Sequence, residues 1–443
     1  MQDGRRLLIV TTSAYTFGGV QHWLSYIVPG LESLGWDVTV GLTSGPRYHC
    51  PEKFLAEIPF RNTCVIHTDT CTPESRAKAV MRVVMECKPD LVMGVNVADT
   101  YEGCRRARLR GWSGKMVMSL HGLEPGYYKD LHHLVAHLDT AIGVNRLACL
   151  AMNTEGGFPE ERISYAPVGV EIHPVAIRRR TNKQLVLAYS GRFEKIPKRV
   201  DDIPRILAAL ADRGVSVTFL VAGSGPEEDG FLRACRAVDA HRVEMLGCLP
   251  AQELGAKLYR RADILLITSS WETGPIVAWE AMASGTVVVS SRYTGCLAEA
   301  ALVDSVNCRL FDVGNVEQAA DCIAELDRDR EQLALLAAGG RQLVESRYTR
   351  LISIEAMDGC LRQIVARSPL PPCGEPVWRH QPAGRLDRWV GQGMGESLRS
   401  VLGKKVSAAG PGSEWPHAYC QGKEPNDEFM KRLEKLEQIE SPV

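Results

Sequence analysis

Glu272 and Glu280 are separated by seven residues in the segment ADILLITSSWETGPIVAWEAMASG, which runs from Ala262 to Gly285. A carboxylate can accept two hydrogen bonds from neighbouring hydroxyl groups, so one glutamate could hold a ribose and the other a sugar ring. The spacing alone is weak evidence, because Glu317 and Glu325 repeat it inside an ordinary solvated helix. The secondary structure around the pair must decide whether the two glutamates form a binding site or lie on a solvated helix.

The same segment predicts a strand, a polar turn and a helix start. Asp263 to Thr268 is typical of a parallel strand covered on both faces, and we expect a helix from about Pro275 to Ser284, with Pro275 as its first residue. The turn then lies at the carboxyl end of a central strand, where open α/β sheets bind ligands. Free backbone N–H groups at the helix start favour an anion there, and a phosphate is the expected guest.

Two basic residues follow the strand predicted at Leu185 to Ser190. Arg192 and Lys198, in the segment GRFEKIPKR, place positive charge beside the same crevice. Such charge would attract a ligand that carries phosphate groups. The alternative interpretation is that both residues only cap solvent-facing turns.

The segment from Glu272 to Gly285, followed by the strand TVVVSS, resembles the E-x7-E donor-site signature of retaining GT-B glycosyltransferases of family 4 (glycosyl transferases group 1). The resemblance extends from about Leu7 to Ala366. It implies an α/β fold of two Rossmann-like domains facing each other across a cleft. It also implies transfer of a sugar, with retention, from a nucleotide-diphosphate sugar to a hydroxyl of a glycan, a lipid-linked glycan or a small molecule. A UDP- or GDP-sugar is the expected donor.

The resemblance also implies roles for individual residues. Glu272, a catalytic candidate, would hold the donor sugar hydroxyls and Glu280 the ribose, while Arg192 and Lys198 would grip the diphosphate. The remaining donor-binding candidates supply backbone groups, and they are Gly274, Ile276, Val277, Gly18, Gly19, Gly247, Cys248 and Leu249. The chain departs from the family at Pro275, which has no N–H to offer a ligand.

His121 is the second catalytic candidate, because SLHG places it at the carboxyl end of a predicted strand. A lone histidine is as often structural, but in the resembling family a histidine at this strand end lies over the donor sugar. We expect no metal and no cofactor, since positive side chains and a helix start already offset the negative charge of the leaving group.

Glu124 and Tyr127 would face the acceptor.

The chain is long enough for two domains and a tail. Strands alternate with helices in both halves, which indicates parallel sheets. We predict an acceptor-side domain at residues 1–170, a linker at 171–184 and a nucleotide-sugar domain at 185–348. A helix at 349–367 would cross back to the first domain, and a tail rich in proline, glycine and charge would follow at 368–443.

Leu386, Trp389, Val390, Leu398, Val401 and Leu402 in this tail could form an apolar face beside basic residues. Such a face would suit a peripheral membrane contact or a partner helix. Four glycines between positions 384 and 395 favour a loosely ordered tail instead. Asp427 to Glu440 predicts a short charged helix.

Composition narrows the function class. The net charge of −1 gives no indication of nucleic-acid binding, and the 14 cysteines form no C-x-x-C pair, which argues against a zinc site and a disulfide framework. No apolar run is long enough to span a membrane and no signal peptide is evident, so we expect a cytoplasmic protein with, at most, peripheral membrane association.

Two alternatives to a transferase stay open. A sugar-nucleotide epimerase uses the same two-domain architecture, and a non-catalytic sugar-nucleotide-binding or scaffold protein would bind the donor without turnover. A nicotinamide oxidoreductase is disfavoured, because the turn GSGPEE after the strand Val217 to Ala222 lacks the third glycine and begins its helix with acidic residues.

Overall fold

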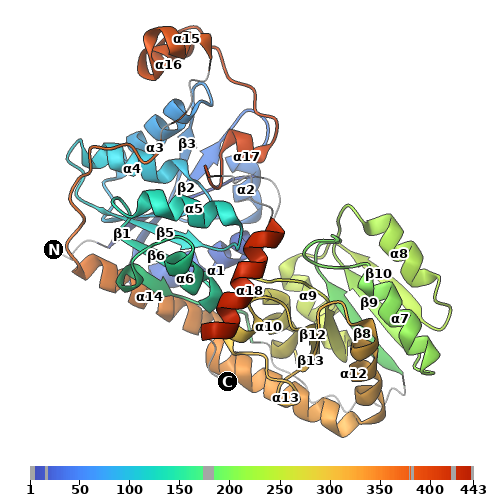
Figure 1. The fold of residues 1–443 in the computed structure, drawn as a ribbon. Coiled ribbons are helices and arrows are strands. Elements are labelled where there is room, and N and C mark those ends of the chain that lie inside the picture. The colour runs from blue at the N-terminus through green and yellow to red at the C-terminus, as the bar shows by residue number, and fades with distance from the viewer. Residues whose placement is uncertain are drawn as a thin grey trace. The chain divides into compact units, whose positions relative to one another are not determined.

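The computed structural model describes residues 5–14, 18–172, 184–378, 380, 384–420 and 426–440. The chain divides into two compact units (Figure 1). Residues 173–183 of the predicted linker lie outside the described residues. The bounds of unit 1 are Met1–Val144, Ala148–Pro167 and Ile354–Phe429, and those of unit 2 are Asn145–Leu147, Val168–Ser353 and Met430–Val443.

Within its described residues, unit 1 is built on a seven-stranded parallel sheet in the order β3-β2-β1-β4-β5-β6-β7. This is the Rossmann order, which places the switch point between β1 and β4. The short edge strand β7 was not predicted. The strands are β1 (Arg6–Thr11), β2 (Asp37–Ser44), β3 (Thr63–His67), β4 (Leu91–Val95), β5 (Lys115–Leu120), β6 (Thr140–Gly143) and β7 (Ile163–Tyr165).

Helices connect these strands as the alternating pattern predicts. They are α1 (Gly19–Ser33), α2 (Pro51–Glu57), α3 (Pro73–Cys87), α4 (Asp99–Arg108), α5 (Pro125–Leu134), α6 (Arg146–Thr154) and the 3₁₀ turn η1 (Glu160–Arg162). Most of α14 (Arg350–Ala366) also belongs to unit 1, which resumes at Ile354. Their starts follow local rules. In α3, for example, Thr72 accepts a hydrogen bond from the amide of Ser75, and Pro73 stands at the first turn, where no N–H is needed.

Unit 2 repeats the same topology. Its described residues form a six-stranded parallel sheet in the order β10-β9-β8-β11-β12-β13, so the switch point lies between β8 and β11. The strands are β8 (Leu185–Ser190), β9 (Val217–Ala222), β10 (Arg242–Gly247), β11 (Ile264–Ile267), β12 (Val287–Ser291) and β13 (Arg309–Phe311). The helices are α7 (Asp202–Asp212), α8 (Glu228–Arg236), α9 (Ala251–Lys257), η2 (Tyr259–Arg261), α10 (Ile276–Ala283), α11 (Cys296–Glu299), α12 (Val316–Arg328) and α13 (Arg330–Arg347).

The central strand β11 is buried on both faces, as its apolar run predicts. Ile264 and Leu266 join the core that includes α7, α8 and α12, while Leu265 and Ile267 join the core that includes α10 and η2. Alternate side chains of a strand point to opposite faces of a sheet, so one short run ties both helical layers to the sheet. The two parallel α/β sheets confirm the predicted fold class of Rossmann-like domains.

The segment from residue 368 onward is more ordered than the expected loose tail. Its described residues include the helices α15 (Arg385–Val390), α16 (Gln392–Val401), α17 (Pro411–Glu414) and α18 (Asn426–Glu440). Trp415 is fully buried and donates a hydrogen bond through Nε1 to the carbonyl of Ser44, 3.0 Å away. Phe429 packs on Tyr128 with ring centroids 5.2 Å apart. These single apolar anchors lack a helical or strand period, so pattern analysis could not detect them.

None of the helices in the described part of the chain is both long and apolar enough to cross a membrane.

Candidate functional site

Two loops of unit 2 meet at the switch point of its sheet. One follows β8 and carries Lys198, and the other follows β11. The hydroxyl of Thr268 donates to the carbonyl of Lys198 over 2.7 Å, and the amide of Ser270 donates to the carbonyl of Pro197 over 2.8 Å. Because β8 and β11 are neighbouring parallel strands, both loops leave the same edge of the sheet. The sequence-predicted basic and acidic residues are thereby brought together.

Lys198 and Glu272 form an ion pair between these loops. The Lys198 Nζ to Glu272 Oε1 distance is 2.6 Å, and the two side chains are only 19% and 10% exposed. The hydroxyl of Ser269 donates to the same carboxylate oxygen over 2.5 Å. Among the described residues, Oε2 of Glu272 accepts no hydrogen bond. The carboxylate is thus oriented through one oxygen and can accept hydroxyl groups of a ligand through the other.

Gly295 supports the backbone of Glu272 from the loop after β12. The amide of Glu272 donates to the carbonyl of Thr294 over 3.2 Å. Gly295 has φ 108°, and a Cβ at this position would stand 2.7 Å from the carbonyl oxygen of Glu272. Only glycine combines this backbone conformation with so close an approach. Residue 295 is therefore fixed as glycine by the position of Glu272.

The start of α10 presents unused backbone donors beside this pair. Pro275 is the residue preceding the helix, one position earlier than predicted, because α10 begins at Ile276. The amide of Ala278 returns to the carbonyl of Pro275 over 2.8 Å. Within the described residues, the amides of Ile276 and Val277 donate to no acceptor, as expected for the first turn of a helix. They form a local positive end that suits an anion.

Glu280 lies one turn further along α10 and is held by Tyr259 of η2. The phenol of Tyr259 donates to Glu280 Oε2 over 2.8 Å. Burial raises the pKa of Glu280 to about 7, and the hydrogen bond from Tyr259 and the charge of Arg350 only partly oppose that rise. Burial therefore destabilises the charged form of Glu280. Hydrogen bonds from ligand hydroxyl groups would stabilise that charged form, so the residue is suited to bind such a ligand.

Arg192 is placed by a contact between two glycine-containing turns. The amide of Phe193 donates to the carbonyl of Ser224 over 2.9 Å, and a Cβ at Gly225 would stand 2.5 Å from that amide nitrogen. The turn after β9 thus braces the loop after β8. The side chain of Arg192 is 69% exposed, and its Nη1 lies 3.0 Å from Glu194 Oε1. Arg192 is near the ion pair in sequence, but its side chain makes no recorded contact with Lys198 or Glu272 within the described residues.

Gly247, Cys248 and Leu249 stand at the carboxyl end of β10, on the same edge of the sheet. The carbonyl of Gly247 accepts the amide of Gly223 over 3.0 Å, and Cys248 is exposed. This position would allow their backbone groups to contact a ligand, which is the role predicted for them from the sequence.

The remaining predicted residues belong to unit 1. His121 directly follows β5, as predicted, and its Nε2 lies 3.0 Å from the hydroxyl of Ser119. Its ring meets that of Trp23 on α1 edge to face, with centroids 4.6 Å apart. Burial lowers the pKa of His121 to about 4, so the ring is neutral at pH 7. Gly18 precedes α1, where its amide donates to Gln21 Oε1 over 2.9 Å, and Gly19 is the first helical residue.

The two acceptor-facing candidates of unit 1 differ in exposure. Glu124 precedes α5 and is exposed. Tyr127 is buried, and its hydroxyl donates to Asn96 Oδ1 over 3.3 Å.

Two residues that contact the site loops of unit 2 were missed. Asn145 donates through Nδ2 to the carbonyl of Thr273 over 3.0 Å. Glu437 of α18 accepts hydrogen bonds from the amides of Gly295 (3.0 Å) and Ala298 (2.7 Å). Both contacts join segments more than a hundred residues apart, and no local motif marks either residue.

Two further observations concern other kinds of site. In the described part of the chain, no group of three or more histidine, cysteine, aspartate or glutamate residues is arranged to hold a metal ion.

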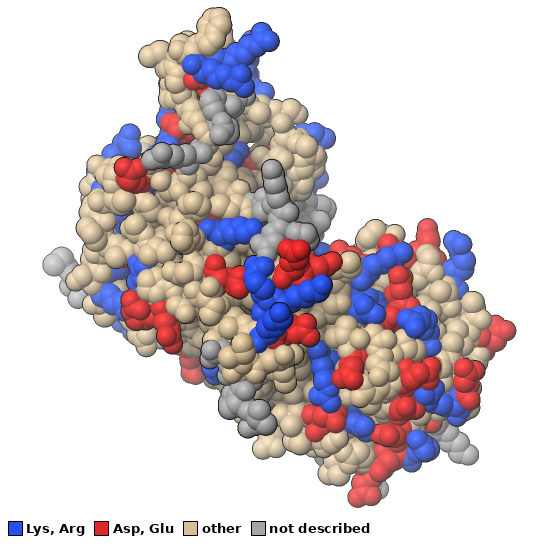
Figure 2. All heavy atoms as spheres, viewed as in Figure 1, with Lys and Arg blue, Asp and Glu red and all other residues tan. Residues whose placement is uncertain are grey.

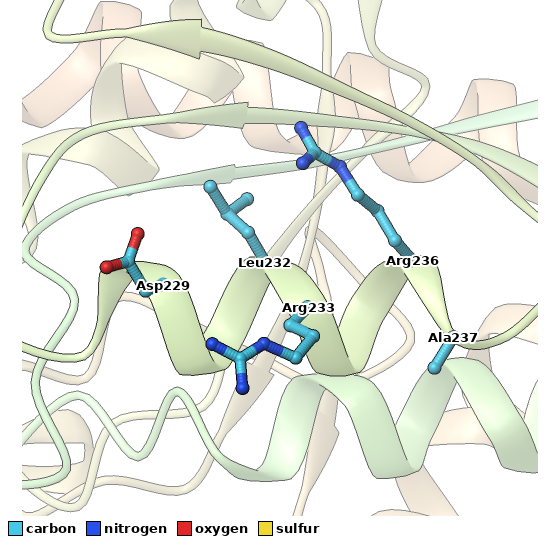
Figure 3. Close-up of a pocket in the computed structure, with 5 residues that line it drawn as sticks. All are labelled: Asp229, Leu232, Arg233, Arg236 and Ala237. Carbon is cyan, nitrogen blue, oxygen red and sulfur yellow. The ribbon is translucent and has the colours of Figure 1, made fainter.

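A hollow of about 540 Å³ runs along α8, and Figure 3 shows the five residues that line it. None of them is a predicted site residue, and all five belong to one helix and the turn after it.

Comparisons with known proteins relate part of the sequence and the fold to glycosyltransferases. Residues 175–343 match the family model described as glycosyl transferases group 1. A curated relative from Mycobacterium tuberculosis, the GDP-mannose-dependent alpha-(1-6)-phosphatidylinositol dimannoside mannosyltransferase, is 32% identical over 151 residues, or 32% of this chain and 38% of the relative. The chain thus spans well under half the length of this relative.

Solved structures share the fold over most of the chain. The lipopolysaccharide outer core galactosyltransferase WaaB superposes with a TM-score of 0.64 at 17% identity, over 81% of this chain and 99% of that one. Anabaena HepE, solved with UDP and glucose, gives 0.65 at 19% identity over 80% and 99%. These neighbours are GT-B glycosyltransferases, so the fold class is GT-B.

Proposed function

We propose that this chain, whose residues 175–343 match the family model of the group 1 glycosyl transferases, moves a sugar from a nucleotide-diphosphate sugar to an acceptor hydroxyl. The Lys198–Glu272 ion pair at the switch point carries the proposal, together with the amides of Ile276 and Val277, which donate to no acceptor among the described residues. It places a cation, free backbone donors and a half-satisfied carboxylate on one edge of a parallel sheet, where such sheets bind nucleotides.

Each group has a task in this reaction. Lys198, with Arg192 and the amides of Ile276 and Val277, would bind the diphosphate and stabilise the negative charge that grows as the nucleotide departs. Glu272 would hold the hydroxyls of the donor sugar through its Oε2 atom. Because these groups already offset the leaving charge, we propose that neither a metal nor a cofactor is needed.

Glu280 would hold the ribose, as the E-x7-E resemblance implies. Within the described residues, its carboxylate accepts a hydrogen bond from the phenol of Tyr259 alone, which leaves capacity for the two ribose hydroxyls. The donor classes that we favour are UDP- and GDP-sugars. The support is that the HepE structure holds UDP and glucose, and that the mycobacterial relative is named as GDP-mannose-dependent.

We further propose that the reaction retains the anomeric configuration and that the acceptor is a glycan or a lipid-linked glycan. Retention follows from the family resemblance alone. It can be tested without the acceptor, because slow hydrolysis of the donor releases a sugar whose first-formed anomer is visible by NMR. We expect the anomer of the donor, and the opposite anomer would contradict a retaining mechanism.

The test of donor binding is calorimetric titration with UDP-, GDP-, ADP- and TDP-sugars in the presence of a chelator. We expect one nucleotide class to bind. Lys198→Met should weaken that binding about ten- to a hundredfold, because a charge-assisted hydrogen bond contributes ~1.5–3 kcal/mol.

Lys195→Met is the matched control for this titration. Lys195 lies in the same loop but faces Asp201 and Glu227, at 3.7 and 3.6 Å, so its loss should leave donor affinity within about twofold. Equal effects of the two substitutions would show that loop charge, not the site, attracts the donor. Absence of binding by every donor would overturn the proposed function. Conversion of the donor sugar without an acceptor would favour an epimerase.

A further inference from the structure

The helix α16 is packed with its polar side inward. Glu396 and Arg399 are 3% and 9% exposed although both are charged. The carboxylate of Glu396 accepts hydrogen bonds from the hydroxyls of Thr70 (2.7 Å) and Thr72 (2.6 Å) of unit 1. Arg399 Nη2 lies 2.5 Å from the carboxylate of Asp387 on α15. The ion pair therefore ties α15 to α16, and the hydrogen bonds of Glu396 attach this hairpin to the rest of unit 1.

The opposite side of the hairpin is apolar and faces solvent. Met394, Leu398, Val401 and Leu402 recur at helical spacing and are all exposed, Val401 by 85%. Trp389 on α15 is 86% exposed. A surface helix normally buries its apolar stripe and exposes its charges, so this hairpin is inverted. Several large apolar side chains exposed together on one short segment mark an interaction site.

The charges around this stripe are of one sign. Arg385, Arg388, Lys404 and Lys405 are exposed, whereas the two acidic residues between positions 384 and 406, Asp387 and Glu396, are buried. Figure 2 shows lysine and arginine side chains gathered over the end of unit 1 that this hairpin forms. The apolar stripe is thus bordered by positive charge that is paired with no acidic side chain among the described residues.

A hollow of about 770 Å³ adjoins the stripe, with Val401 on its rim. Lys78, Arg82 and Arg110 line it together with further arginines, and Asp69 and Glu74 are among its acidic members. Five of the lining side chains are basic and three are acidic, and Lys78 and Arg82 pair with Glu74 and Asp69. Only a small excess of positive charge therefore continues from the hairpin onto α3 and α4.

We propose that the hairpin of α15 and α16 docks on an anionic lipid bilayer. Trp389, Met394, Leu398, Val401 and Leu402 would enter the boundary between headgroups and acyl chains, and the four exposed cations would meet the headgroups. Tryptophan and aliphatic residues on one face with lysine and arginine beside them are the composition of interfacial helices. This docking is independent of the proposed sugar transfer.

Charge decides between this occupant and the other candidates. A second copy of the chain would bring the same four cations against one another, which disfavours a symmetric dimer through this face. The core of a protein interface is depleted in lysine, whereas an anionic membrane surface attracts each lysine or arginine near it.

The experiment is sedimentation of the full chain with vesicles of phosphatidylcholine alone and of phosphatidylcholine with phosphatidylglycerol in equal parts. We expect binding to the anionic vesicles only, falling as salt is raised from about 0.1 M to about 1 M, where the Debye length shrinks from ~10 Å to ~3 Å. Trp389 should shift its emission to the blue on binding, and Trp389→Phe should remove that change.

Two sets of variants separate the contributions. Replacing Arg385, Arg388, Lys404 and Lys405 by glutamine should weaken partitioning roughly fivefold for each charge removed. The triple variant Trp389→Ser, Val401→Ser, Leu402→Ser should abolish binding. These side chains are exposed, so thermal unfolding should be unchanged. Leu335→Ser on α13, an equally exposed leucine of unit 2, is the control and should bind as the unaltered chain does.

Three outcomes would overturn the proposal. The first is that the protein sediments equally with both kinds of vesicle, or with neither kind. The second is binding that the triple variant retains. The third is a concentration-dependent dimer that the triple variant loses, without vesicle binding, which would identify a second copy as the occupant.

Discussion

Glu280→Gln should make the protein more stable and a poorer binder at the same time. Burial raises the pKa of Glu280 from 4.5 to about 7, so the folded chain holds a proton that the unfolded chain has already released between those two pH values. For an acid with a raised folded-state pKa, stability is fully present below pH 4.5 and is lost as the pH rises through 7. Each pKa unit stands for ~1.4 kcal/mol, so the loss is about 3 kcal/mol.

Glutamine does not titrate, and its carbonyl can still accept the phenol of Tyr259. The variant should therefore match the unaltered chain near pH 4.5 and exceed its free energy of unfolding by up to about 3 kcal/mol at pH 8. Donor affinity at pH 8 should fall about ten- to a hundredfold if the carboxylate holds the ribose. Gain of stability and loss of binding at one residue is the behaviour of a functional site.

Urea unfolding of the full chain at pH 4.5, 6 and 8, followed by donor titration at pH 8, measures both quantities. Glu253→Gln on α9, a solvent-exposed glutamate paired with Lys257, is the control and should show neither effect. A stability difference that does not change with pH would refute the buried, titrating Glu280. Unchanged donor affinity would remove Glu280 from the site.

Two further predictions concern unit 1. The pKa of His121 is lowered from 6.5 to about 4, so stability should be full above pH 6.5 and fall by about 3 kcal/mol as the pH drops through 4. In urea unfolding, His121→Gln should lose that pH dependence, whereas the exposed His132→Gln should keep it. Parallel curves for His121→Gln and the unaltered chain would contradict the assignment. Trp415→Ala should cost ~3–5 kcal/mol of unfolding free energy, because its fully buried indole also bonds to Ser44. Trp389→Ala, at an exposed tryptophan, should cost almost nothing, and equal costs would mean that the C-terminal segment is not part of the core of unit 1.

The sheet of unit 2 and the candidate site residues at its carboxyl edge could be predicted because they depend on local pattern. The run ILLI specifies a strand buried on both faces, and the resemblance around Glu272 and Glu280 identified the turn that follows it. Lys198 lies 74 residues from Glu272, yet both were found, because each follows a strand and parallel strands end at one edge of a sheet.

What could not be predicted depends on contacts without a local signature. Tyr259 is the hydrogen-bond partner of Glu280, but nothing in the segment YRR distinguishes it from a surface tyrosine. Glu437 reaches the amide of Gly295 over a separation of 142 residues, and its helix is an ordinary charged helix in sequence. The burial of Glu396 and Arg399 on α16 was also missed, since an apolar stripe predicts which residues share a face and not what the opposite face contacts.

The hydrogen bonds from Thr268 and Ser270 have a consequence for the kinetics of ligand capture. They lock the loops after β8 and β11 into one rigid piece before any ligand arrives, so little conformational entropy remains to be lost on association. Affinity differences between donors should then reside in the rate of release and not in the rate of capture. A preformed binding site should therefore distinguish its ligands by their residence times.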